Sequence, residues 1–227
     1  MNMSRILTWN MQNQPIVHSF GSATYAADWV LPERTIPDHE IFLMFEGETT
    51  FWLDRRLFHL KPGDVLLFGP NQLQYGEAVD TGGRTWSYHV HYSPEATPEW
   101  IDAEEMAQAY AELSGQTPGA GTLLESGALS RRVYLHEHLS LGAEQDAIFR
   151  LFERAREEQF SGRYGALQLA GLLLGEIILR LTRITLERAL GAAAPSRKTN
   201  PLFQEAVDLM NRNMGPNLSM EALARQL

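Results

Sequence analysis

The chain has 227 residues, of which 44% are hydrophobic and 21% are charged, so it is expected to be globular rather than disordered. It contains no cysteine, which excludes disulfides, thiolate nucleophiles and sulfur-ligated zinc. The formal net charge of −9 argues against a complete nucleic-acid binder, because phosphate contacts need a concentrated patch of Lys and Arg.

Neither an export signal nor a membrane segment is apparent in the sequence. No apolar run reaches the ~18 residues that a spanning helix needs. Residues 1–10 lack the long apolar core of a signal peptide. We therefore expect a cytoplasmic protein without a membrane partner.

Short apolar or alternating segments separated by turn residues run from Trp29 to Tyr92, a pattern typical of an all-β sandwich or barrel. Glycine, proline and asparagine at the breaks suit the dihedral angles of tight turns. The expected strands cover residues 40–45, 49–53, 57–60, 65–68 and 85–92.

The last of these strands has two chemically different faces. His89 and His91 are two residues apart, so that both project to one face of the strand. The other face carries Trp86, Tyr88, Val90 and Tyr92. One of the two faces is expected to line a pocket.

Beyond Pro94 the apolar period changes to one near 3.6, which predicts helices at 99–113, 143–160 and 163–190. The longest helix has two apolar stripes and therefore needs two partners, of which one could be the β-domain and the other the same helix of a second subunit. The alternative is that both apolar stripes are buried by other parts of the same chain. The stripe predicted to dimerise consists of Leu167, Ala170, Leu174, Ile177, Leu181 and Ile184.

A linker is predicted at residues 191–199, which contain a proline and little to bury. An amphipathic helix is expected at 201–213 and the beginning of another at 220–227, with Ser219 as its N-cap.

Two parts of the sequence together resemble a known family. Residues 34–47, 60–70 and 86–92 resemble the cupin-type sensor domain of the arabinose regulator, and residues 203–227 are similar to the opening of the AraC-type helix-turn-helix domain. The resemblance implies an α+β chain with a cupin-like jelly-roll barrel at 1–95 that binds an effector. It further implies a helical dimerisation region at 96–190, the linker at 191–199 and an incomplete DNA-binding domain at 200–227.

The function that this resemblance implies is ligand-responsive transcription regulation, without catalysis and without a cofactor. The expected partners are a sugar or another small polar effector, a second copy of the chain, and operator DNA in the full-length protein only. The turn, the recognition helix and the second helix-turn-helix of the family do not follow Leu227, so this chain alone is not expected to bind an operator.

Several effector-binding residues are expected in the barrel. Aligned with sugar-responsive relatives, His89 takes the place of an aromatic that stacks on the effector, and His91 shares its face. Arg34 lies where sugar-binding members carry an effector-contacting arginine, whose guanidinium holds two oxygens of a ligand. Trp86 is a further candidate, and Trp29 and Trp52 could also wall the pocket.

A metal-dependent cupin isomerase or dioxygenase is the alternative. Enzymes of the cupin type hold a metal with several histidines and a glutamate. Here the first motif offers only His39, and Gln74 stands where the later histidine is expected. A single histidine with a glutamine does not make an open three-ligand site, so His39 and Gln74 are expected to contact the effector and no metal is predicted. A third possibility is a module that dimerises without any effector.

Overall fold

The computed structural model describes residues 5–79, 82–115 and 131–190. The chain divides into two units, Met1–Ala189 and Leu190–Leu227. Apart from Leu190, the last residue of a helix, the described strands and helices lie in the first unit. The predicted linker and helix-turn-helix opening lie outside the described residues.

The largest sheet, which we call the inner sheet, has five antiparallel strands. Its order across the sheet is β12 (His138–Ser140), β7 (Asp64–Phe68), β4 (His39–Glu46), β9 (Thr85–Ser93) and β2 (Ile16–Tyr25). The predicted strands at 40–45, 65–68 and 85–92 are confirmed as β4, β7 and β9, whereas β2 and β12 were not predicted.

A second antiparallel sheet, the outer sheet, has four strands. Its order is β3 (Val30–Arg34), β8 (Gln74–Val79), β5 (Glu48–Leu53) and β6 (Arg56–Leu60). The hairpin between β5 and β6 turns on Asp54 (φ 47°) and Arg55 (φ 69°), and positive φ at both central residues gives the twist that a two-residue hairpin needs.

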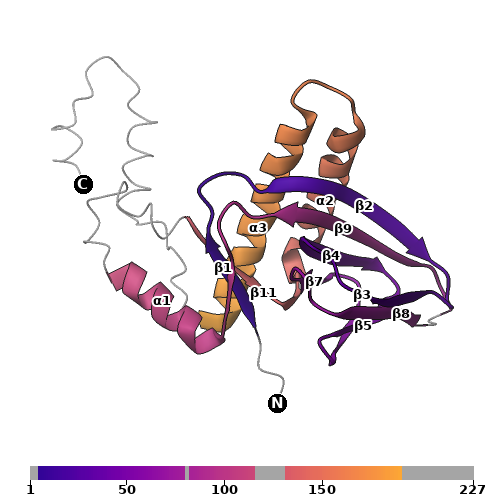
Figure 1. The fold of residues 1–227 in the computed structure, drawn as a ribbon, viewed down its shortest axis with the longest axis horizontal. Coiled ribbons are helices and arrows are strands. Elements are labelled where there is room, and N and C mark those ends of the chain that lie inside the picture. The colour runs from indigo at the N-terminus through magenta and orange to yellow at the C-terminus, as the bar shows by residue number, and fades with distance from the viewer. Residues whose placement is uncertain (1–4, 80–81, 116–130, 191–227) are drawn as a thin grey trace, which may run out of the picture. The chain divides into compact units, whose positions relative to one another are not determined.

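Two helices cover the side of the inner sheet that faces away from the outer sheet. They are α2 (Gln145–Phe160) and α3 (Ala166–Leu190), as predicted apart from their first residues. In Figure 1 both lie on the side of β2 and β9 that faces away from β3, β5 and β8. Ile148, Phe152 and Ala155 of α2 are buried at helical spacing and form the face that meets the sheet.

Cover on both faces explains the unbroken apolar run of β4, because side chains alternate between the faces of a strand. Ile41 and Leu43 belong to the core shared with α2 and α3. Phe42 and Met44 belong to the core between the inner and outer sheets. We call these the helix face and the cavity face of the inner sheet.

A small third sheet has the order β10 (Glu99–Ile101), β1 (Ile6–Asn10) and β11 (Arg132–His136). The free edge of β11 is satisfied by α3, because the backbone N–H groups of Tyr134 and His136 donate to the Oγ1 atoms of Thr182 and Thr185. Helix α1 (Ala103–Gly115) adds Met106 to a small core with this sheet. The region 96–190, expected to be helical, thus also contains the strands β10, β11 and β12, and the helix predicted at 99–113 begins only after β10, as α1.

The stripe predicted to dimerise faces the chain's own core. Its members Ala170, Leu174, Ile177, Leu181 and Ile184 are all buried against the inner and small sheets. A second chain cannot reach these buried residues. For this stripe the alternative holds, in which the chain itself covers the apolar face of the helix. Only Leu167 of the predicted set is exposed. The exposed apolar stripe on α3 is the other one, with Leu172 and Leu179.

Candidate functional site

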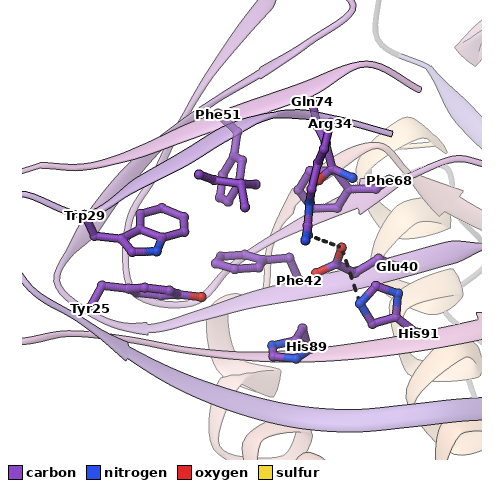
Figure 2. Close-up of a pocket in the computed structure, with 11 residues that line it drawn as sticks. Tyr25, Trp29, Arg34, Glu40, Phe42, Phe51, Phe68, Gln74, His89 and His91 are labelled. Carbon is purple, nitrogen blue, oxygen red and sulfur yellow. Dashed lines mark ion pairs between the residues drawn. The ribbon is translucent and has the colours of Figure 1, made fainter. Parts of the chain in front are cut away.

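A cavity of about 270 Å³ lies between the inner and outer sheets. Strands of both sheets line it, and Figure 2 shows its side chains converging from opposite sides. The lining residues are Tyr25, Trp29, Leu31, Arg34, Glu40, Phe42, Phe51, Phe68, Gln74, His89 and His91.

Strand β9 provides the two histidines because of its alternation. Tyr88 and Val90 point to the helix face and are fully buried there, so that His89 and His91 point to the cavity. His89 lies across Gly21, its cross-strand partner in β2. A Cβ atom at Gly21 would lie 2.2 Å from His89 Nε2, so the glycine makes room for the imidazole.

The polar end of the cavity is built around Glu40, which is buried. Its Oε2 atom lies 3.9 Å from Arg34 Nη2 and 3.8 Å from His91 Nε2, and Figure 2 shows both ion pairs. His91 Nδ1 in turn donates to Asp38 Oδ1 at 3.1 Å. Both contacts of Glu40 are longer than a hydrogen bond, so its Oε2 has no hydrogen-bond partner among the described residues.

Gln74 completes the polar end from the outer sheet. It pairs with Arg34 across β3 and β8, which places both side chains at the same end of the cavity. The residue is 1% exposed, and neither Oε1 nor Nε2 of its amide has a hydrogen-bond partner in the described part of the chain. Buried polar atoms are nearly always hydrogen-bonded, so an unpaired amide at a cavity wall indicates a place for a ligand or for water.

The opposite end of the cavity is aromatic. The rings of Tyr25 and Trp29 pack with centroids 4.2 Å apart, and Trp29 meets Phe51 edge-on at 6.3 Å. The Tyr25 hydroxyl is held by Ser87 Oγ at 2.9 Å. In Figure 2 these rings lie away from Arg34, Gln74 and Glu40, so the cavity has an apolar end and a polar end.

Burial sets the protonation states at the polar end. Desolvation, with smaller contributions from the neighbouring His91 and Arg34, lowers the pKa of His89 to about 4, so its imidazole is neutral at pH 7. Desolvation raises the pKa of Glu40, although His91 and Arg34 act in the opposite direction. The cavity therefore disfavours charge on both groups.

The sequence matches a family model described as AraC-like ligand binding domain over residues 16–167. The chain belongs to this family. The matched range holds all the strands that line the cavity, so the cavity is part of the AraC-like domain. No curated protein matches the chain.

Solved structures of cupin type are similar to the AraC-like domain at low identity. A cupin superfamily protein from Desulfitobacterium hafniense is 17% identical, covering 39% of this chain and 77% of its own, with a TM-score of 0.31. A predicted oxalate decarboxylase from Thermotoga maritima is 15% identical, covering 34% of this chain and 68% of its own, with a TM-score of 0.32. A DMSP lyase from Ruegeria pomeroyi is 19% identical, covering 36% and 42%, with a TM-score of 0.30.

The predicted fold class is confirmed as a mainly antiparallel, cupin-like jelly roll. Its sheets face each other without joining into one closed barrel within the described residues. None of the described helices is long and apolar enough to cross a membrane. In the same residues no three histidine or carboxylate side chains are grouped to hold a metal ion.

Of the residues predicted to contact an effector, the structure brings Arg34, Gln74, His89 and His91 together around the cavity. Trp86 lies on the opposite side of β9, where its ring meets Phe45 at 4.4 Å in the core with the helices. Because side chains alternate between the two faces of a strand, Trp86 points to the face opposite His89 and His91 and does not line the cavity.

His39 also points away from the cavity. It stands opposite Tyr92 in the β4–β9 pair, and the two ring centroids are 5.6 Å apart. Burial lowers the pKa of His39 to about 4, with Asp38 acting in the opposite direction. Its neighbour Glu40 faces the cavity instead, because adjacent residues of a strand point to opposite faces.

Sequence reasoning missed Glu40, Tyr25 and the phenylalanines of the cavity wall. The sequence does place Glu40 on the same face of β4 as Phe42, because the two are two residues apart in the strand. It did not show which face of β4 points to the cavity. Trp29 was considered and does line the cavity. Trp52, considered with it, packs against Tyr75 at 5.1 Å and is absent from the cavity wall.

Proposed function

We propose that this AraC-like domain senses a small molecule in the cavity and belongs to a transcription regulator. The observation that carries the proposal is the pair of buried polar groups without a hydrogen bond in the described residues, Glu40 Oε2 and the Gln74 amide, at the wall of a cavity with an aromatic end. Leaving such groups unpaired costs ~1–3 kcal/mol each unless something else pairs them. A polar ligand would repay that cost, which is what a sensor site requires.

Contacts across the inner sheet offer a route from the cavity to the helices. Tyr88, next to His89 in β9, donates its hydroxyl to Glu153 Oε1 of α2 at 3.0 Å. The backbone N–H of Phe20, next to Gly21, donates to Gln159 Oε1 of α2 at 2.7 Å. A ligand that moves His89 therefore shifts two strands that are tied to α2. In this proposal the shift changes how the helices present the DNA-binding part of the regulator.

The proposed partner of the domain is a second copy of the chain, seated on the exposed stripe of α3. Leu167 and Leu172 line a groove together with Ile16, and Leu179 continues the stripe. Apart from the adjacent residues and backbone of α3 itself, no atom of the described residues lies within 4 Å of the Cβ position at Gly175, which leaves room for another helix. Large exposed apolar patches on a soluble domain mark interaction sites.

Sedimentation velocity tests the dimer. Leu172→Lys should convert a dimer to a monomer, and Leu57→Lys, on the exposed side of β6, should leave the dimer intact. A parent protein that is monomeric at tens of micromolar would contradict this part of the proposal.

The enzyme alternative, a metal-dependent isomerase or dioxygenase, is not preferred. The cavity wall includes His89, His91 and Glu40, but in the described residues these side chains are not grouped to hold a metal ion. Gln74 occupies the place of the later histidine of such enzymes. Elemental analysis separates the two functions, because an enzyme of that kind retains stoichiometric metal after purification. The proposal includes a cytoplasmic location, where the regulator would meet operator DNA.

The test of sensing is a thermal-shift screen with pentoses, hexoses, sugar acids, small aromatic acids and aromatic amides. A ligand that binds only the folded state raises the melting temperature with its concentration. We expect a saturable rise with one chemical class, lost in His89→Ala and kept in His59→Ala, whose histidine is on β6 outside the cavity. No rise with any class would favour a module that works without an effector.

A further inference from the structure

We infer that the cavity takes an aromatic ring compound with one uncharged amide edge, a ring carboxamide or a lactam, in preference to a sugar or a carboxylate. This inference rests on the proposed function and names the class of its ligand. Three features of the cavity carry it: the segregation of its apolar and polar ends, the state of the Gln74 amide, and the balance of charge.

The apolar end is too large and too poor in hydrogen-bond partners for a polyol. Phe42 and Phe51 offer ring surfaces only, Trp29 adds a single N–H donor, and the Tyr25 hydroxyl is already paired with Ser87. A sugar carries hydroxyls around its whole ring, so most of those at this end would lose water without gaining a partner, at ~1–3 kcal/mol each. An aromatic ring has no such groups and gains by packing edge-on or offset against these rings.

The Gln74 amide specifies the head group. Its Oε1 accepts and its Nε2 donates, and the two atoms lie side by side on one planar edge. Both are without a partner in the described residues. A carboxamide or lactam presents the complementary N–H and C=O on one edge and pairs with both atoms at once. A carboxylate offers acceptors only, which leaves Oε1 unpaired and opposed to a negative charge.

The charges at the polar end favour a neutral head group as well. The two basic side chains at this end, Arg34 and His91, already face carboxylates of the protein: Arg34 lies 3.9 Å from Glu40, and His91 lies 3.8 Å from Glu40 and 3.1 Å from Asp38. A carboxylate ligand would stand beside the unpaired Oε2 of Glu40, whereas an amide N–H can donate to that atom. Burial of His89, which lowers its pKa to about 4, removes a further positive charge that could have held an anion.

The size of the cavity limits the ring. At about 270 Å³ it is slightly smaller than most small-molecule pockets, which run from ~300 to 1,000 Å³. This volume suits one aromatic ring or a fused pair with a short head group.

The experiment is calorimetric titration of the protein with matched probes at pH 7.5. The pairs are benzamide with benzoate and indole-3-carboxamide with indole-3-carboxylate, and D-xylose and D-glucose represent sugars. We expect the amide of at least one pair to bind about tenfold or more tightly than its carboxylate and the sugars, because a buried polar site rejects analogues that leave it unpaired. Gln74→Met, which keeps the length and removes both polar atoms, should weaken amide binding by a similar factor.

Gln108→Met, at an exposed position of α1, is the matched control and should bind like the parent. Circular dichroism and the melting temperature establish that each variant is folded. Tighter binding of a carboxylate or a sugar than of the amides would overturn the inference while the sensor function stands. Unchanged amide affinity in Gln74→Met, or no binding of any amide, would also overturn it. If no compound of any class binds to the folded protein, the sensor function fails too.

Discussion

The two faces of the inner sheet are built from the same strands and differ in what they do with polar groups. On the helix face, Tyr88 and Val90 of β9 pack among phenylalanines of α2 and the apolar side of α3. On the cavity face, His89 and His91 of the same strand meet Glu40 across an open space. A single alternating strand thus contributes to the core with one set of side chains and to the wall of the proposed binding cavity with the other.

This contrast leads to an order of expected effects on the free energy of unfolding. Changes to the helix face remove packing and should be costly, whereas changes to the cavity face remove groups that are unpaired in the unliganded protein. Variants on the two faces test the contrast, from the largest effect to the smallest.

Phe152→Ala should have the largest effect. Phe152 is fully buried, where it meets Phe20 edge-on at 5.8 Å and lies 6.1 Å from Tyr88. Truncating such a ring leaves a cavity and costs ~3–5 kcal/mol. Urea denaturation followed by circular dichroism measures the loss, with Trp29→Ala, half-buried at the cavity, as the matched aromatic truncation of smaller cost. A loss below ~1 kcal/mol for Phe152→Ala would break the contrast.

The next effect is the dependence of stability on pH. The pKa values of His39 and His89 fall from the usual 6.5 to about 4 on folding, so the unfolded chain binds more protons between these values. The free energy of unfolding should therefore fall as the pH is lowered from about 6.5 towards 4, by on the order of 3 kcal/mol for each histidine, and level off below. The raised pKa of Glu40 acts in the opposite direction, stabilising at low pH and losing its effect as the pH rises above its ordinary value.

Urea melts at several pH values measure this slope. His39→Asn and His89→Asn should each flatten it, and His18→Asn, an exposed histidine of β2, should not. An equal slope in all the proteins would show that neither buried histidine is kept neutral by folding.

Two tyrosines of the helix face form a matched pair with a smaller effect. The Tyr88 hydroxyl donates to Glu153, whereas the Tyr92 hydroxyl is buried without a hydrogen-bond partner in the described part of the chain. Tyr88→Phe should lose ~1 kcal/mol, and Tyr92→Phe should be neutral or slightly stabilising. A loss at Tyr92→Phe as large as that at Tyr88→Phe would mean that the Tyr92 hydroxyl has a partner in solution.

Gln74→Met should have the smallest effect on stability. It replaces an unpaired buried amide by an apolar chain of similar length, so the free energy of unfolding should change by less than ~0.5 kcal/mol or rise. A loss above ~1 kcal/mol would show that the amide contributes to folding and is not reserved for a ligand.

Much of the fold could be predicted from local signals. Glycine and proline breaks located β4, β5, β6, β7 and β9, and the 3.6 period located α2 and α3. Strand β2 was missed because its alternation is between small polar and apolar residues, as in Ser19, Phe20 and Gly21, which is a weak pattern. The stripe predicted to dimerise is buried in the chain's own core. The period shows that a helix has two apolar faces without showing which of them its own sheets cover.

The site was predicted only in part, because alternation along a strand shows that it has two faces without showing which of them lines the cavity. His89, His91 and Arg34 were found from strand parity and from the resemblance to sugar-responsive regulators. The prediction chose His39, whereas its neighbour Glu40 lines the cavity. Which face of β4 points to the cavity depends on which sheets pack together. That information comes from tertiary structure and is absent from a single strand.

The most direct test of the central claim, that the cavity binds a small molecule, uses the tryptophan indole signals in a two-dimensional NMR spectrum. The chain has five tryptophans, of which Trp29 lines the cavity and Trp86 packs on the helix face. Each signal is assigned by a Trp→Phe variant, and the compounds of the thermal-shift screen are then titrated. We predict a saturable shift of the Trp29 signal with one chemical class while the Trp86 signal stays in place. A shift of Trp86 without Trp29, or no shift with any class, would contradict the account.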